Sequence, residues 1–270
     1  MAPLYRKALI IGATSGIGEA FAAKLHSEGT AVIVTGRRRD RLDAFVASHP
    51  RSSAAVIDIV QLDSIPAFAA SVIQEHPDLD LLVLNAAVMR PVDFARPESV
   101  DLSSFDEEFT TNYVAFVHLA TAFLAHFQRR SREGKGGHLF FVNSAMALVP
   151  TLVRASGYNA SKAALHSWVL NLRQQLKDAG YSGIKVVEVF PPAVQTENMR
   201  KSHMVNGGEV GMPLDVFTEL MYEGLVRGDE QFAMGAEQEW ITNGFEAERV
   251  RLFQEGHLRV KQALEKSIKN

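Results

Sequence analysis

Short apolar runs alternate with amphipathic stretches along most of the chain. The runs are rich in Val, Ile, Leu and Phe, and they predict buried strands at residues 8–11, 31–35, 54–59, 79–84, 138–143, 184–190 and 231–234. Stretches with helical spacing between them predict helices at residues 16–28, 39–48, 62–76, 105–130, 156–179 and 213–227. Such alternation is typical of a parallel sheet with helices on both faces. We therefore predict an α/β fold, with one doubly wound domain over residues 1–270 and a central, mostly parallel seven-stranded sheet.

The end of the chain predicts an addition to this domain. Asn243 and Gly244 interrupt the pattern, and apolar residues then recur at helical spacing from Phe245 onward. We expect a C-terminal helical extension over about residues 245–268, which adds to an interface or shields a site.

The composition narrows the class of protein. The chain has 28 Lys and Arg against 31 Asp and Glu, and its net charge of −3 gives no electrostatic reason for binding nucleic acid or an anionic membrane. The lack of Cys excludes disulfides, thiolate metal sites and a Cys nucleophile. No apolar run approaches the ~20 residues of a membrane span and no signal peptide is visible, so we expect a cytoplasmic protein. The nine His residues lack metal-ligand spacing, and we predict no metal site.

Three glycines follow the first predicted strand. Gly12 would allow a tight turn, Gly16 would let the backbone approach a pyrophosphate, and Gly18 would let the next helix pack close to the strand. Ser15 offers an N-cap to that helix. Because backbone N–H groups and the helix dipole converge there, we predict a dinucleotide site. The alternative is a glycine-rich loop that serves only as a turn.

The second predicted strand ends in Gly36-Arg37-Arg38-Arg39, with no acidic residue before Asp40. An acid at this place binds the ribose of NAD, whereas arginine accommodates the 2′-phosphate of NADP. We therefore expect NADP(H) rather than NAD(H), with Arg37 as the first contact and Arg38 as the second. The alternative is a basic start to the following helix, which the helix dipole disfavours.

Two polar residues lie at the ends of further strands. Asp58 closes the third predicted strand and Asn85 the fourth, where strand ends line the ligand crevice of an open parallel sheet. Each is equally well explained as a turn residue, because Asp and Asn are common in turns.

Tyr158 and Lys162 provide the candidate chemistry. At i and i+4 of a helix they share a face, so the lysine cation would lower the pKa of the phenol and make Tyr158 a proton donor to a carbonyl oxygen. Tyr181 and Lys185 repeat the spacing, and a serine stands 14 residues before each tyrosine. Context favours the first copy, because Ser144 follows a predicted strand whereas Tyr181 lies between glycines where the helix ends.

In these ordered motifs the chain resembles the short-chain dehydrogenase/reductase family over about residues 5–235, which implies a Rossmann-type domain. The resemblance implies Tyr158 as acid/base and Lys162 as the residue that holds the nicotinamide ribose and lowers the tyrosine pKa. Ser144 would orient the substrate oxygen, and Asn112 would hold a water in a proton relay. The other cofactor contacts that the resemblance implies are Thr14, Ser15, Ile17, Asp58 near the adenine, Ile59, Asn85 beside the adenosine ribose, Ala86, Ala87, Pro191, Val194 and Thr196.

The chain departs from the family pattern at a few positions. Ile11 replaces a usual threonine, Ala87 replaces a glycine, and Pro192 replaces the glycine of a Pro-Gly pair. Ala87 adds a methyl group where backbone approach matters, and Pro192 should stiffen the hinge of the segment over the nicotinamide.

The expected substrate loop spans about residues 197–212. Met side chains line adaptable apolar surfaces, so Met and aliphatic residues near the site favour a small hydrophobic carbonyl or alcohol substrate. Those in this loop or after the predicted strand ends are Met89, Met146, Leu148, Val149, Leu152, Met199, Met204, Val205 and Met212. They are equally well explained as core residues. Glu197 and His203 are candidates for substrate contact or for solvated loop positions. By resemblance, the two long helices pair the chain into a homodimer or homotetramer.

Three functions are consistent with these features. The first is an NADP(H)-dependent oxidoreductase that interconverts a carbonyl and an alcohol. The second is an NADP(H)-binding sensor or scaffold with little turnover, which would not need the set Ser144, Tyr158, Lys162 and Asn112. The third is epimerisation or dehydration of a nucleotide-linked sugar. Proteins with that function usually have a longer C-terminal substrate domain.

Overall fold

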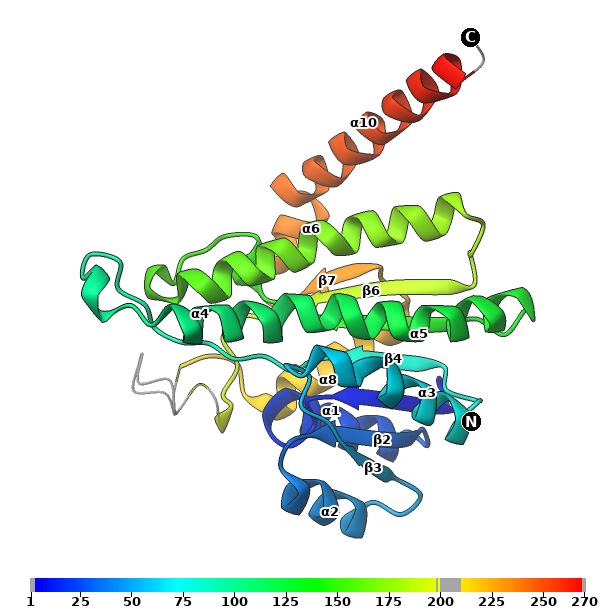
Figure 1. Ribbon diagram of the computed structural model, residues 1–270, viewed down its shortest axis with the longest axis vertical. Helices are drawn as coiled ribbons and strands as arrows, with labels where there is room; N and C mark the ends of the chain where they lie inside the picture. The colour runs from blue at the N-terminus through cyan, green and yellow to red at the C-terminus, as the bar shows by residue number, and fades with distance from the viewer. Residues whose placement is uncertain (1–2, 198, 200–209, 269–270) are drawn as a thin grey trace.

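The computed structural model describes residues 3–197, 199 and 210–268. Its centre is a seven-stranded sheet in the order β3-β2-β1-β4-β5-β6-β7, and every neighbouring pair of strands is parallel (Figure 1). The predicted fold class is therefore confirmed. The strands are β1 (Lys7–Ile11), β2 (Ala31–Gly36), β3 (Ser53–Val56), β4 (Leu81–Leu84), β5 (Gly137–Val142), β6 (Ile184–Phe190) and β7 (Gln231–Ala233).

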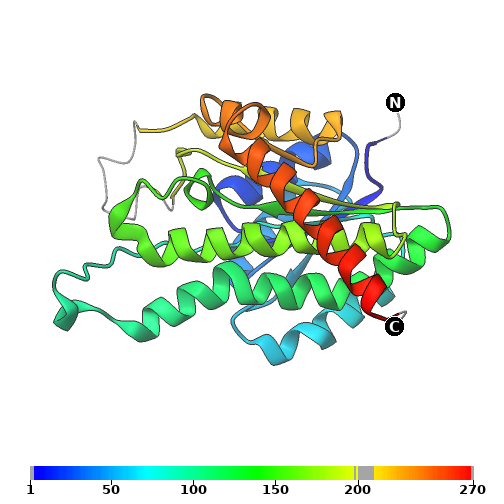
Figure 2. The ribbon, with the colours of Figure 1, turned by 90° about the horizontal axis from the view of Figure 1, so that it is seen from above.

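Helices cover both faces of the sheet (Figure 2). One face carries α1 (Gly16–Ser27), α2 (Arg39–Ser48) and α8 (Leu214–Arg227), and the other carries α3 (Ile65–Glu75), α5 (Ala115–Arg132) and α6 (Ser156–Asp178). Each face has its own apolar core, because the strands are buried on both sides. The strand order reverses between β1 and β4, which is where open parallel sheets bind ligands.

The long helix before β5 is interrupted by a feature that the apolar spacing did not predict. Instead of one helix over 105–130, α4 (Leu102–Phe109) runs into a π-helical segment, η3 (Thr110–Val114), and then into α5. The start lies earlier than predicted because the Asp101 carboxylate accepts a hydrogen bond from the Ser104 N–H at 3.1 Å.

Several strands are shorter than predicted at one end. β3 ends at Val56, so Asp58 and Ile59 lie in the turn beyond it rather than in the strand. Four short 3₁₀ turns in the described residues were not predicted as such. Two directly precede a helix, η1 (Leu62–Ser64) and η5 (Val153–Ala155), and two lie where no regular element was expected, η2 (Pro97–Ser99) and η4 (Ala145–Ala147).

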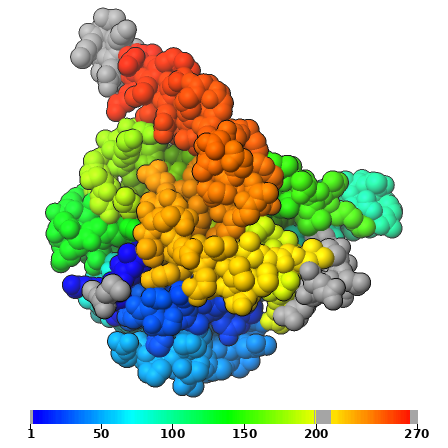
Figure 3. Space-filling view, turned by 180° about the vertical axis from the view of Figure 1, so that it is seen from behind, coloured from blue at the N-terminus to red at the C-terminus, as the bar shows by residue number. Residues whose placement is uncertain are grey.

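The C-terminal segment forms α9 (Glu237–Thr242) and α10 (Phe245–Ile268), so the predicted C-terminal helix is present. Helix α10 stands out from the rest of the molecule (Figure 3). Near its middle, His257 Nε2 lies 2.7 Å from the Asp178 carboxylate at the end of α6. Leu252, Leu258 and Val260 are exposed on this helix.

Candidate active site

A cleft of about 470 Å³ lies at the carboxyl ends of the strands, beside the reversal between β1 and β4. Most of the residues predicted to bind the cofactor line this one cleft: Gly12, Thr14, Ser15, Gly16, Ile17, Arg37, Arg38, Asp58, Ile59, Asn85, Ala86, Ala87, Pro191, Val194 and Thr196. Tyr158, Lys162 and Ser144 line its other part. Gly18 and Asn112 are not among the residues that line it.

The glycine-rich turn is tightly packed. Gly12 has a positive φ of 86°, and a Cβ atom there would lie 2.6 Å from the Ala86 Cα. A Cβ at Gly18 would lie 2.2 Å from the Gly12 carbonyl oxygen, so the close approach of α1 to β1 requires glycine. Asn85 Nδ2 donates to the same oxygen at 2.8 Å and fixes the turn to the end of β4.

Arg38 binds the glycine-rich turn from the end of β2. Its guanidinium donates to Thr14 Oγ1 at 2.7 Å and to Ser15 Oγ at 2.7 Å, and Nη1 lies 3.7 Å from the Glu197 carboxylate. Ser15 occupies the N-cap position of α1 but makes no capping hydrogen bond with its side chain.

Arg37 is exposed at the rim of the cleft and has no hydrogen bond or ion pair to any residue that the structure describes. The two arginines therefore differ, since one is anchored to the turn and the other presents a solvated guanidinium.

Asp58 caps its own turn, because its carboxylate accepts a hydrogen bond from the Val60 N–H at 3.3 Å. Asp58 and Asn85 thus both make the local hydrogen bonds of a turn residue while they line the cleft.

Helix α6 and the end of β5 bring the three polar groups of the catalytic end together. Tyr158 and Ser144 are hydrogen-bond partners, and Ser144 Oγ also accepts from the Met146 N–H at 3.1 Å. Lys162 is only 1% exposed, and its Nζ donates to the Val142 carbonyl at 2.9 Å. This ammonium lies 5.7 Å from the centre of the Tyr158 ring.

The electrostatics of this end differ from the prediction. Burial raises the pKa of Tyr158, the Ser144 hydrogen bond opposes the rise, and the charge of Glu108 adds to it. Burial also lowers the pKa of Lys162 to about 7, against the opposing charge of Glu188. The pKa of Tyr158 is therefore raised, mainly by its own burial, and not lowered as expected from Lys162.

Asn112 lies in the π-helical segment η3 and is fully buried. Its Oδ1 accepts from the Val88 N–H at 2.9 Å, while Nδ2 donates to the Val88 carbonyl at 2.8 Å and to Ser161 Oγ at 3.2 Å. The side chain therefore ties the segment after β4 to α6, and the π-helical turn sets its position.

The second Tyr-x-x-x-Lys pair is not assembled. Tyr181 lies beyond the end of α6 and its hydroxyl accepts a hydrogen bond from Arg132, whereas Lys185 is exposed on β6. Ser167 lies on the exposed side of α6.

Sequence patterns missed several buried charged residues around the site. Glu108 on α4 is 1% exposed; its Oε2 accepts from the Arg90 N–H at 3.0 Å, and its Oε1 has no hydrogen-bond partner in the described parts of the chain. Burial raises the pKa of Glu108 to about 7. His166, Glu188 and Glu246 are also buried. The one signal of these residues in the sequence was Glu188, which lies inside the apolar run of β6. An unpaired charge is rarely buried in a strand, so its presence there indicates a buried partner.

Apolar side chains continue the cleft beyond Tyr158. Met89 and Met199 line it, and the turn after Ser144 places Met146, Leu148 and Val149 in partly buried positions. Met212 pairs with Val194 through a short parallel bridge at the end of the predicted substrate loop. The candidates Met204, Val205 and His203 lie outside the described residues.

No helix in the described part of the chain is long and apolar enough to cross a membrane. Within the same residues, no group of three or more His, Asp or Glu side chains is arranged to hold a metal ion.

Comparison with known proteins shows the family to which the chain belongs. Residues 6–205 match the family model of short chain dehydrogenases, and the chain belongs to this family of oxidoreductases. It is 29% identical to the uncharacterized oxidoreductase DltE of Bacillus subtilis (strain 168), with 92% of this chain and 94% of that protein covered. It is 28% identical to a farnesol dehydrogenase of Aedes aegypti, over 80% of this chain and 88% of that protein.

The fold also has solved counterparts. A short-chain dehydrogenase from Sphingobium yanoikuyae, in complex with NADPH, superimposes with a TM-score of 0.77 at 24% identity. The match covers 92% of this chain and 94% of that one.

Proposed function

We propose that this protein is an NADP(H)-dependent oxidoreductase that interconverts a carbonyl and an alcohol on a small hydrophobic substrate. The observation that carries the proposal is the placement of Tyr158, Ser144 and Lys162 in one cleft with the glycine-rich turn and two arginines. A dinucleotide has a phosphate end and a redox end, and the cleft offers groups suited to each.

The residues present fit such a cofactor. The N-terminus of α1 and the hydroxyl groups of Thr14 and Ser15 suit the pyrophosphate. Arg37 and Arg38 suit a 2′-phosphate, because guanidinium groups pair with phosphate oxygens in two hydrogen bonds. Pro191, Val194 and Thr196 would lie over the nicotinamide end, with Asp58, Ile59, Asn85, Ala86 and Ala87 around the adenosine. The Sphingobium enzyme, which binds NADPH, has the same fold.

The chain's own residues would move the proton. When bound, the nicotinamide supplies or accepts a hydride at the substrate carbon. Tyr158 donates its phenolic proton to the substrate oxygen in reduction and takes it back in oxidation. Ser144, already hydrogen-bonded to Tyr158, orients the same oxygen. Lys162 holds the nicotinamide ribose, and Asn112 keeps the segment after β4 in place for a water that returns the proton.

The substrate end favours an apolar molecule. Met89, Met199 and Val88 line the cleft near Tyr158, and such side chains adapt to hydrophobic groups of varied shape. Farnesol, the alcohol in the name of the mosquito relative, is one compound of this kind.

The proposal is tested by following NADPH and NADH oxidation against a panel of hydrophobic ketones, aldehydes and quinones. We expect turnover with NADPH well above NADH, and loss of at least about a hundredfold in Tyr158→Phe with NADPH binding retained. Tyr181→Phe is the matched control, because it removes the hydroxyl of the other Tyr-x-x-x-Lys pair and should keep full activity. Equal turnover by Tyr158→Phe and wild type would refute the assignment.

The alternative is an NADP(H)-binding sensor with little turnover. It predicts tight NADPH binding without oxidation of any substrate in the panel, and no effect of Tyr158→Phe on the protein's function.

A further inference from the structure

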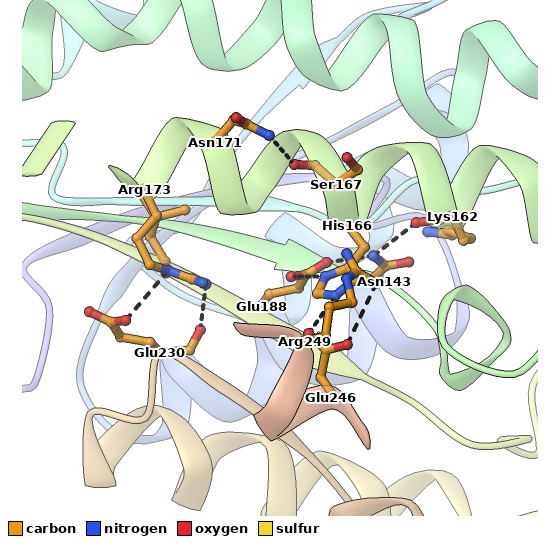
Figure 4. Close-up of polar contacts among 11 residues, drawn as sticks. Asn143, Lys162, His166, Ser167, Asn171, Arg173, Glu188, Glu230, Glu246 and Arg249 are labelled. Atoms are coloured by element: carbon orange, nitrogen blue, oxygen red, sulfur yellow. Dashed lines mark hydrogen bonds and ion pairs between the residues drawn. The ribbon is translucent and has the colours of Figure 1, made fainter. Parts of the chain in front are cut away.

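A cluster of buried charges lies on the side of Asn143 away from Lys162 (Figure 4). His166 follows Lys162 by one turn of α6, Glu188 comes from the middle of β6, and Glu246 comes from the first turn of α10. All three side chains are fully buried. His166 Nδ1 lies 2.8 Å from the Glu188 carboxylate, and Nε2 lies 2.9 Å from the Glu246 carboxylate. Helix α10 therefore supplies one of the two carboxylates that hold the imidazole.

The cluster is joined to the catalytic end through Asn143. Its Nδ2 donates to Glu188 Oε1 at 2.5 Å and to the Lys162 carbonyl at 3.2 Å. Asn143 immediately precedes Ser144, and the carbonyl of Val142 accepts from Lys162 Nζ at 2.9 Å. The Val142 carbonyl and the Asn143 side chain thus bind the end of β5 to Lys162. Glu188 in turn fixes the side-chain amide of Asn143.

His166 and Glu188 hold opposite charges within the cluster. Burial alone would lower the pKa of His166, but the two carboxylates raise it to about 9, so the imidazole is a cation at neutral pH. Burial likewise opposes ionisation of Glu188, yet His166 and Asn143 hold its pKa below the ordinary value. The Glu188 charge in turn favours the Lys162 cation.

The charged groups around the cluster are few. Lys162 faces Tyr158 on its own helix and Glu188 on β6, and the charge of Glu108 reaches Tyr158 from α4. Arg173 on α6 acts on Glu188 from the other side.

On α10, Arg249 Nη1 lies 3.6 Å from Glu246 Oε2 and is 42% exposed. That oxygen has no hydrogen-bond partner among the residues described. The outer carboxylate is therefore held mainly by His166.

We infer that Glu188, His166 and Glu246 are positioning residues for the catalytic lysine, and that α10 completes the site by supplying Glu246. The cluster fixes Asn143 against Lys162 and keeps a buried negative charge beside its ammonium. Docking of the C-terminal helix then sets how readily Lys162 holds its proton. The role of Lys162 in turnover rests on the proposed function, but its protonation can be measured without cofactor or substrate.

The test is competitive labelling of the cofactor-free, full-length protein with trace isotopic acetic anhydride across a pH series. Only the neutral amine reacts, so the labelling rate of the Lys162 peptide, read by mass spectrometry, reports the midpoint of its titration. Glu246→Gln removes the outer charge and keeps the shape. Glu248→Gln is the matched control, because Glu248 lies on the same turn of α10 and pairs with the exposed Arg251.

We expect the midpoint to fall in Glu246→Gln and to stay unchanged in Glu248→Gln. A fall of one pH unit, from a midpoint near 7, would raise labelling at pH 6 about fivefold. A general loosening of structure would let water reach Lys162 and move the midpoint up, toward the ordinary value of a lysine, which is the opposite direction. An unchanged midpoint in a folded Glu246→Gln protein would overturn the inference.

Glu188→Gln keeps the inference testable if Glu246→Gln does not fold, because glutamine is isosteric and can still accept from Asn143. Its midpoint must fall further than that of Glu246→Gln, and an unchanged midpoint would again overturn the inference. Absence of turnover in the wild type would refute the proposed function while leaving these shifts intact, so the two failures are distinguishable.

Discussion

Replacing Glu108 by glutamine should stabilise the protein at neutral pH. Glu108 is buried between α4 and the start of α6, and only its Oε2 is hydrogen-bonded, to the Arg90 N–H. Its other oxygen has no hydrogen-bond partner among the described residues. Burial raises its pKa from 4.5 to about 7, so the folded state resists the charge that the unfolded chain carries freely.

The magnitude follows from the difference between the two pKa values. A rise of about 2.5 units at about 1.36 kcal/mol each corresponds to roughly 3 kcal/mol at pH 8, where Glu108 is ionised in both states. Below pH 4.5 it is protonated in both states and the cost vanishes. Stability is therefore lost as pH rises from 4.5 through 7. Glutamine stays neutral, so the free energy of unfolding of the Glu108→Gln protein should exceed that of the wild type by about 1 kcal/mol at pH 5 and roughly 3 kcal/mol at pH 8.

Urea unfolding followed by tryptophan fluorescence at pH 5 and pH 8 measures both values. Glu107→Gln is the matched control, since Glu107 is the neighbouring, partly exposed acid that pairs with Arg90 at 2.9 Å, and its removal should change stability by less than about 1 kcal/mol at either pH. A Glu108→Gln protein that is less stable than wild type at pH 8, or whose gain does not depend on pH, would refute the reasoning.

Three further changes test other parts of the structure. Gly18→Ala should lower the free energy of unfolding in urea by about 1–3 kcal/mol, because its Cβ would lie 2.2 Å from a backbone oxygen. Gly256→Ala on α10 should raise the free energy of unfolding by about 0.5–1 kcal/mol. Arg37→Ala should weaken NADPH binding about tenfold in fluorescence titrations and leave NADH binding unchanged; equal losses for both would argue against a 2′-phosphate contact. The pKa of His138 is lowered to about 4 by burial, so the wild type should lose up to about 3 kcal/mol between pH 6.5 and 4 in denaturation series, and His138→Gln should remove that slope.

The sequence predicted the layers of the fold because strands buried on both faces are apolar throughout. The run at β4, Leu81–Leu84, is buried at every position, as expected of a short apolar run that is bounded by turns. Element ends were less predictable. The third strand stops at Val56 because Asp58 turns the chain by accepting a hydrogen bond from the Val60 N–H, and apolar spacing carries no information on that hydrogen bond.

The π-helical turn at Thr110–Val114 was missed for a related reason. A π-helical turn adds one residue to the helix, and apolar spacing within a short window does not show where such a residue is inserted. The consequence is large in space, since it decides where Asn112 points and which backbone groups it binds.

Motif residues were found because they lie close to strand ends, and the topology brings those ends together. Gly12, Asn85 and Ser144 follow β1, β4 and β5, which are neighbours in the sheet. Glu246 had no such signal, because it lies 80 residues from His166 and resembles any acid in the first turn of a helix. Only the packing of α10 shows that it is buried and paired.

The buried charges that the sequence concealed act on the proton chemistry of the site in one direction. The charge of Glu108 raises the pKa of Tyr158, and the charge of Glu188 opposes the lowering of the Lys162 pKa, so each carboxylate favours the protonated form of the group that it faces. A protonated tyrosine beside a lysine cation is the state that reduction of a carbonyl requires, whereas oxidation of an alcohol begins with a tyrosine that can accept a proton. Removing either charge should therefore impair reduction at neutral pH more than oxidation at alkaline pH. Because Glu188 is held by His166, and His166 by Glu246, that balance extends to the C-terminal helix.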